Sequence, residues 1–219
     1  MPSTRRQRNK RAKKKLDRHL EALERGYYRE ISIMYRQWFA EVVRRLNRLT
    51  RKRFDSERFD SPISDLFDEM LGIWNQNVQT FTARIRKQAN GIRRLSSIFW
   101  NETTGDVVDL GVNPLLAEPW LQPAMDAFAE QNVRLITKLG VESIADVQRI
   151  VQDGQINGTS TKEIAKQLRD VNKKFSGFRS RLIARDQTSK LNSQLTMLRA
   201  ERAGVDKYEW STSGDSRVR

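Results

Sequence analysis

Apolar residues recur every three or four positions along most of the chain, the spacing that places them on one face of an α-helix. One run covers residues 16–49 and predicts a long amphipathic helix that ends near Arg53. A second run covers residues 63–99 and follows Ser61 and Pro62, a pair typical of a helix start. Two helices of similar length with a short connection are expected to fold back as an antiparallel hairpin.

The pattern changes at residues 101–123, where two glycines and three prolines interrupt any long helix. We interpret this stretch as a linker between the hairpin, residues 16–100, and a second helical domain, residues 124–219. Because a helix rises about 1.5 Å per residue, each arm of the hairpin would reach roughly 60 Å. The hairpin is therefore expected to be an extended rod.

The second domain is expected to contain several shorter helices with recognisable ends. Helices near residues 123–139 and 143–152 are closed by Gly140 and Gly154, and a later helix from about 177 to 203 is stopped by a further glycine. Between them a helix begins at Ser160. Its side chain can accept a hydrogen bond from the amide of Glu163, while the Glu163 side chain can accept one from the amide of Ser160.

The end of the sequence changes from helical spacing to alternation. Residues 205–211 have the β-branched and aromatic bias of a strand, and residues 213–215 would turn the chain. The partner strand would begin at residue 216 and is not finished, so we expect the chain to be a fragment of something longer. The predicted fold class is mainly α: a long antiparallel helical hairpin, then a small helical domain ending in the start of a β-hairpin.

Positive charge is concentrated at one end of the chain. Residues 1–53 hold 18 Lys and Arg against 5 Asp and Glu, whereas residues 54–219 hold 23 against 22. Residues 1–15 form the most basic stretch, which we interpret as a flexible arm. Its candidate nucleic-acid-binding residues are Arg5, Arg6, Arg8, Lys10, Arg11, Lys13, Lys14 and Lys15.

Charge alone indicates a polyanionic partner without choosing among nucleic acid, anionic lipid and an acidic protein surface. The arm has no interleaved aromatic residues, which disfavours base stacking, so any contact with nucleic acid would be with the backbone. A solubilising or partner-directed tail is the alternative. The sequence has no cysteine and no apolar run of about 18 residues, which excludes thiolate chemistry and predicts a protein made in the cytosol without a membrane span.

Three other features of the sequence could carry chemistry. His19 is the single histidine and is expected to be a solvated helix residue, so no transition-metal site is predicted. Asp206, Glu209 and Asp215 could in principle hold magnesium, but their order matches no nuclease signature, and turn or strand-edge carboxylates explain them. Residues 154–162 lack the lysine that a phosphate loop places after its last glycine, so a loop and a helix cap are expected.

Aromatic residues on the hairpin, among them Trp38 and Trp74, are expected to be core or oligomer contacts rather than cofactor ligands. An apolar seam on a charged rod also suggests self-association or docking to a larger assembly. No cofactor is predicted.

Four segments carry a resemblance to a known family: residues 132–136 (NVRLI), 158–168 (GTSTKEIAKQL), 181–188 (RLIARDQT) and 208–219 (YEWSTSGDSRVR). The region from about residue 132 to 219 is similar to the Mu F-like, or minor head protein, family of tailed phages. The positions that match the family motif are Arg185, Asp186, Trp210, Asp215 and Arg217. In the family the last stretch continues to a histidine and a Leu-Asp-Gly-like turn, before which this sequence stops.

The resemblance implies a non-enzymatic minor head protein of the virion, inside the head near the portal vertex, acting in head morphogenesis and in DNA packaging or ejection. Its expected partners are the portal protein, other head proteins and, through the basic arm, double-stranded DNA. The alternative is a non-viral nucleic-acid-binding protein with a coiled-coil dimerisation rod. A metal-dependent nuclease built on Asp206, Glu209 and Asp215 is the third hypothesis.

Overall fold

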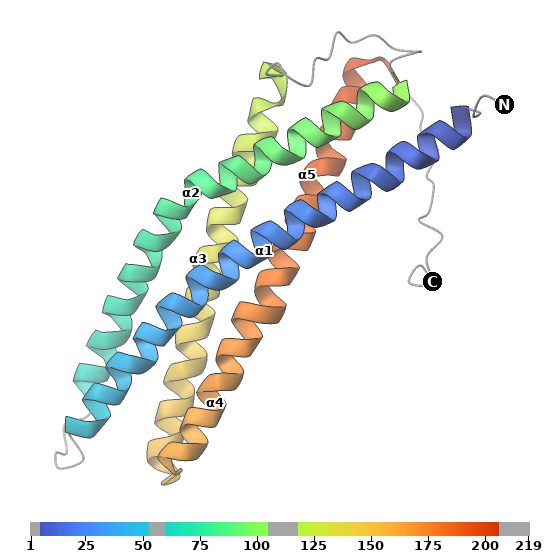
Figure 1. The fold of residues 1–219 in the computed structure, drawn as a ribbon. Coiled ribbons are helices and arrows are strands. Elements are labelled where there is room, and N and C mark those ends of the chain that lie inside the picture. The colour runs from blue at the N-terminus through green and yellow to red at the C-terminus, as the bar shows by residue number, and fades with distance from the viewer. Residues whose placement is uncertain (1–4, 53–59, 105–117, 206–219) are drawn as a thin grey trace.

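The computed structural model describes residues 5–52, 60–104 and 118–205 (Figure 1). Its elements, in chain order, are α1 (Arg5–Lys52), α2 (Asp60–Thr104), the 3₁₀ turn η1 (Pro119–Leu121), α3 (Gln122–Ile156), α4 (Thr161–Lys173), the π-helical segment η2 (Lys174–Arg179) and α5 (Ser180–Arg202). The mainly α prediction and the antiparallel hairpin are confirmed. These described ranges contain no strand, and the predicted strand and turn after Val205 lie outside them.

The hairpin does not stand alone as a rod, because α3 and the α4–α5 run pack lengthwise against it (Figure 1). One apolar core receives buried side chains from all the long helices. The separate domain expected from residue 124 onward is therefore part of the same bundle as α1 and α2. Both ends of the expected linker belong to the bundle, since α2 continues to Thr104 and Glu118 is buried.

Aromatic residues fill the centre of this core. The ring centroids of Trp38 and Trp74 are 4.9 Å apart, and Tyr35 packs against Phe175 with centroids 6.0 Å apart. Trp38 Nε1 donates to the carbonyl oxygen of Met70 at 2.8 Å, which satisfies the polar atom of a buried indole. Trp38 and Trp74 are thus core residues, one of the two roles that the sequence predicted for them.

Gly140 does not end a helix, contrary to the sequence prediction. It lies inside the continuous helix α3, where a Cβ atom would stand 2.2 Å from Cδ1 of Trp74. Trp74 Nε1 lies 3.1 Å from the carbonyl oxygen of Ile136 and 3.2 Å from that of Thr137. The glycine therefore admits an indole against the backbone of α3, a packing role that chain-local reasoning could not distinguish from a helix stop.

The α4–η2–α5 run is one unbroken helical path, although the sequence predicted a separate helix from about residue 177. A π-helical segment accommodates an extra residue without ending the helix, which is how the chain passes through Gly177. The predicted cap is confirmed in its first half, since Ser160 Oγ accepts from the amide of Glu163 at 3.3 Å. The predicted stop is also confirmed, because Gly204 follows α5 with φ of +69°.

The basic arm is the remaining correction. Residues 5–15 are the first three turns of α1 rather than a flexible tail. Lys, Arg, Gln and Ala are all good helix formers, and the packed part of α1 supplies the nucleus from which the helix extends.

Candidate nucleic-acid interface and buried polar network

The basic residues predicted to bind nucleic acid lie on the N-terminal turns of α1, which we call the basic segment (Arg5–Lys15). The side chains that the structure describes there are all exposed: Arg8, Lys10, Arg11, Lys13, Lys14 and Lys15. Lys15 also makes an ion pair with Glu102 of α2 at 3.2 Å. The helix thus fixes the backbone positions from which these cations project, which a flexible tail would not do.

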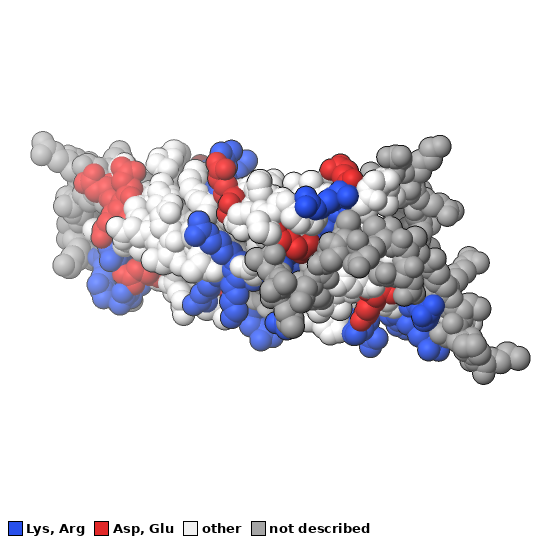
Figure 2. Space-filling model, turned by 90° about the horizontal axis from the view of Figure 1, so that it is seen from above, with Lys and Arg blue, Asp and Glu red and all other residues white. Residues whose placement is uncertain are grey.

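Charge is distributed unevenly along the bundle. On the face drawn in Figure 2, acidic side chains gather at the end where α1 and α2 are joined, while Lys and Arg continue along the middle and lower edge. The net charge summed over residues 54–219 conceals one basic stretch. Residues 70–101 hold five Lys and Arg and no acidic residue, which the sequence shows when shorter windows are counted.

A buried ion pair joins the beginning of η1 to the end of α5. Arg199 is fully buried and approaches Glu118 through two nitrogens, Nε to Oε1 at 2.8 Å and Nη2 to Oε2 at 2.5 Å. Its Nη1 donates to Ser96 Oγ and its Nη2 to Ser97 Oγ, both at 2.6 Å, so α2 completes the network. This planar, bidentate arrangement is the geometry that arginine favours with carboxylates.

The network keeps Glu118 ionised. Burial acts to raise the pKa of this carboxyl, but the hydrogen bonds from Arg199 and Ser97 and the charges of Arg199 and Arg93 outweigh it, so the pKa lies below its ordinary value. Sequence reasoning missed this site. The available signal was the position of Arg199, four residues after the buried Leu195 on the core face of α5.

A second polar network crosses the bundle and includes Asn132, the first residue of the segments that resemble the family. Tyr27 Oη donates to Asn132 Oδ1 at 2.8 Å, and Asn132 Nδ2 lies 3.4 Å from Gln187 Oε1, so α1, α3 and α5 are connected. Gln88 of α2 donates to Thr188 Oγ1 at 3.2 Å. The hydroxyls of such a core do not ionise readily, and burial raises the pKa of Tyr27.

The motif residues Arg185 and Asp186 lie beside this network on the outside of α5. Arg185 is exposed, and its charge acts on the half-buried Glu24 of α1, whose pKa is raised by burial against that attraction. Asp186 pairs with Lys190 at 2.8 Å and accepts from Gln187 at 3.0 Å. Trp210, Asp215 and Arg217 lie outside the described residues, as do the carboxylates of the nuclease hypothesis.

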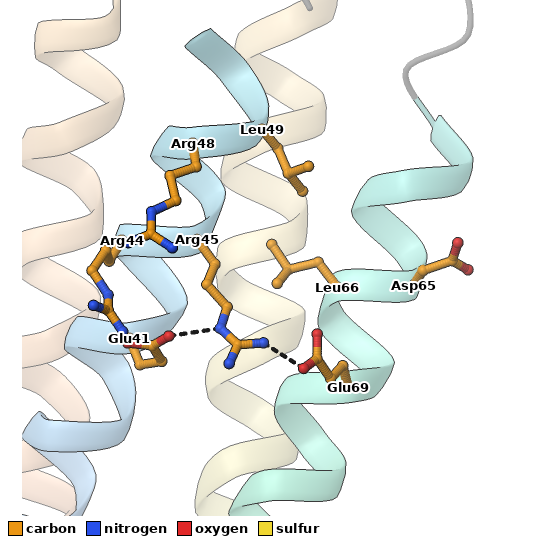
Figure 3. A pocket seen from close by; sticks show the side chains of 8 residues that line it. All are labelled: Glu41, Arg44, Arg45, Arg48, Leu49, Asp65, Leu66 and Glu69. Carbon is orange, nitrogen blue, oxygen red and sulfur yellow. Dashed lines mark hydrogen bonds and ion pairs between the residues drawn. The ribbon is translucent and has the colours of Figure 1, made fainter. Parts of the chain in front are cut away.

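Hollows on the surface of the described residues include one between α1 and α2 and one between α3 and the η2–α5 run. The one in Figure 3 lies between α1 and α2 near their connection, where Arg45 donates to Glu41 at 2.6 Å and also pairs with Glu69. Hydrogen bonds from Arg45 and Arg44 lower the pKa of Glu41. Arg44, Arg45, Glu41 and Glu69, which line the hollow, thus pair with one another. The other hollow lies between α3 and the η2–α5 run and is lined by apolar and charged residues: Leu135, Lys138, Leu139, Glu142, Arg179, Leu182, Ile183 and Asp186.

Neither hollow contains a candidate metal site among the described residues. Within the described ranges, no three or more His, Cys, Asp or Glu side chains come together as a metal site would require. His19 is exposed, with a ring nitrogen 2.7 Å from the carbonyl oxygen of Lys15. No helix in the described part of the chain has the length and apolar character needed to cross a membrane.

Comparison with known proteins supports the resemblance noted from sequence. Residues 145–219 match the family model described as "Phage Mu protein F like protein". The match starts in the second half of α3, includes α4, η2 and α5, and continues past the described residues. The resemblance to the Mu F-like family is thereby confirmed for the C-terminal third of the chain.

A relative is found in Haemophilus influenzae. This "Uncharacterized protein" is 38% identical over 101 residues, which are 46% of this chain and 22% of the relative. The chain therefore matches only about a fifth of the length of that relative. No solved structure matches the chain.

Proposed function

We propose that this protein is a minor head component of a tailed phage that contacts double-stranded DNA through the basic segment and other head proteins, the portal among them, through its helical body. The observation that carries the proposal is the Mu F-like match over residues 145–219. The proposed role is structural rather than catalytic, in head morphogenesis and in DNA packaging or ejection, close to the portal vertex.

The DNA contact rests on the basic segment. The cations from Arg8 to Lys15 project from a helix and are exposed, and residues 5–15 include no aromatic residue, so these cations suit the phosphate backbone rather than stacked bases. Each phosphate that such a cation neutralises releases bound counterions, which makes the affinity steeply dependent on salt. Inside a head packed with DNA, this contact would need no sequence preference.

The rival reading as a dimeric coiled-coil protein loses support from the packing. The apolar residues of the hairpin that would form a dimer seam, such as Trp38, Trp74 and Ile31, are buried in this chain by α3 and α5. A dimer would have to use another surface.

Charge-neutral substitution tests the DNA contact. In the variant K10Q/R11Q/K13Q/K14Q four exposed cations become glutamine, which favours helix as well as lysine does, so the fold should be retained. We expect weaker binding to a 30-bp duplex and a log Kobs against log[salt] slope shallower by roughly 2 to 4, at about 0.9 per lost phosphate contact. The measurement is fluorescence anisotropy between 50 and 300 mM salt.

The matched control is K162Q/K166Q/R169Q/K173Q, which removes four exposed charges from α4 at the other end of the bundle. Equal effects of the two variants would show that only net charge matters and would remove the role of the basic segment. Membership of the head is tested separately, by mass spectrometry of purified particles and by co-purification with the portal protein. Absence from particles would contradict the head assignment whatever the DNA result.

A further inference from the structure

The basic segment is not the only exposed row of cations on the hairpin. The acid-free stretch of α2 carries Arg84, Lys87 and Arg94, all exposed. None of the three has a carboxylate partner among the described residues, and Arg84 lies over the ring of Phe81 at 5.8 Å. Because these cations are not held by internal ion pairs, no such pair must break before they contact an anion.

The packing of the hairpin places these α2 cations beside α1. A Cβ atom on Gly91 would be 3.3 Å from Leu23 of α1, so this side of α2 faces α1. Lys87 and Arg94 are four residues before and three residues after Gly91, and Arg84 is seven before, which puts all three on that side of the helix. Their exposure places them on the outer surface of the hairpin, away from α3 and α5.

The same reasoning orients the α1 cations. Lys15 pairs with Glu102 of α2, so its side of α1 faces α2. Arg8, Arg11 and Arg18 are at helical spacing from Lys15 and are exposed. We define the basic strip as these four residues of α1 together with the three α2 cations.

The basic strip is long. Since Leu23 lies beside Gly91 and the helices are antiparallel, Arg84 is at the level of about residue 30 of α1, so the strip runs roughly 33 Å along the bundle at 1.5 Å per residue. At these levels of the hairpin, Glu102 pairs with Lys15 and Glu21 pairs with Arg25. Glu24 and Glu30 are half-buried, and Asp17 is exposed. This length is close to the ~34 Å of one turn of B-form DNA.

We propose that the basic strip is a double-stranded DNA backbone site in which Arg84, Lys87 and Arg94 of α2 act together with the basic segment of α1. The inference rests on the proposed function and extends it from the first turns of α1 to the folded hairpin. A row of exposed cations on a rigid surface matches the regular phosphates of a duplex.

The test uses the full chain with R84Q/K87Q/R94Q, and K162Q/R169Q/K173Q of α4 as the matched three-charge control. We expect the strip variant to bind a 30-bp duplex at least tenfold more weakly at 100 mM salt and to show a salt slope shallower by about 2.7. The control should remain close to the parent. Unchanged helicity by circular dichroism and an unchanged melting temperature establish that each variant is folded.

Each outcome separates this inference from the proposed function. If K10Q/R11Q/K13Q/K14Q weakens DNA binding while R84Q/K87Q/R94Q behaves like its control, the strip is overturned and the basic segment stands. If the parent binds no duplex at 50 mM salt, both DNA roles fail, while head membership is unaffected. If the strip variant loses binding only to vesicles containing 30% anionic lipid and keeps its DNA affinity, the site is assigned to the wrong polyanion and the proposal is overturned.

Discussion

Replacing Arg199 by methionine should expose the energetic role of the buried network. The substitution keeps an unbranched side chain of similar length but leaves the Glu118 carboxylate without its bidentate partner and removes the donors that reach Ser96 and Ser97. Removing one member of a buried ion pair typically destabilises by about 3–5 kcal/mol, because an uncompensated charge remains. For a domain of this size that corresponds to roughly 6–20 °C in melting temperature.

The effect should depend on pH in a defined direction. In the parent the pKa of Glu118 is lowered from its ordinary value of 4.5, so its contribution to stability is present at neutral pH and is lost as the pH falls through the folded-state pKa. In R199M the opposing effect of burial dominates and should raise that pKa. The difference in unfolding free energy between parent and variant should therefore be largest near pH 7 and shrink toward pH 4.

Urea denaturation followed by circular dichroism at pH 4, 5.5 and 7 measures this difference. A double-mutant cycle with E118Q isolates the pair, and we expect the double variant to be more stable than the sum of the single losses predicts. A loss below about 1 kcal/mol for R199M at pH 7, or additive losses in the cycle, would refute the reasoning. The control is Arg202→Met. Arg202 lies on the same helix as Arg199, and its guanidinium is 5.0 Å from the ring centroid of Trp120 in η1.

Two further predictions concern the core. Gly140→Ala should destabilise by about 1–3 kcal/mol in urea denaturation because its Cβ would overlap Trp74, whereas Gly72→Ala, where nothing lies within 4 Å, should stabilise slightly; equal effects would contradict the packing role. Burial raises the pKa of Tyr27 and Tyr35 above their ordinary 10.0. The free energy of unfolding should therefore fall as the pH rises above about 10. An ultraviolet titration in which both tyrosines ionise near pH 10 while the protein stays folded would overturn this prediction.

Sequence pattern alone predicted the hairpin because its apolar positions repeat at one period over two long stretches, and the same pattern identified Trp38 and Trp74 as packed residues. The pattern does not say what covers an amphipathic face. That α3 and α5 cover the hairpin depends on contacts between residues far apart in the chain, such as Tyr27 with Asn132. Gly140 shows the same limit, since its meaning is set by Trp74, 66 residues earlier.

The candidate site was predicted in part. The basic segment was found from charge density, but its helical state was not, because a run of lysines reads equally as a solvated tail or as the end of a helix. The α2 cations were not found because the charge of residues 54–219, taken as a whole, is nearly balanced. The buried Arg199 was invisible because charge normally marks a surface position, and only the carboxylate and hydroxyls gathered around it make burial tolerable.

The contact of Trp74 with the backbone at Gly140 has a consequence for the history of this protein. The indole belongs to the hairpin, whereas the glycine lies just ahead of the region that matches the Mu F-like family. A larger residue at position 140 would be tolerated only if position 74 shrank with it, so the two positions should vary together among homologues. Recombination that replaced the hairpin alone would therefore disrupt this contact, and we expect the hairpin and the helices packed against it to be inherited together.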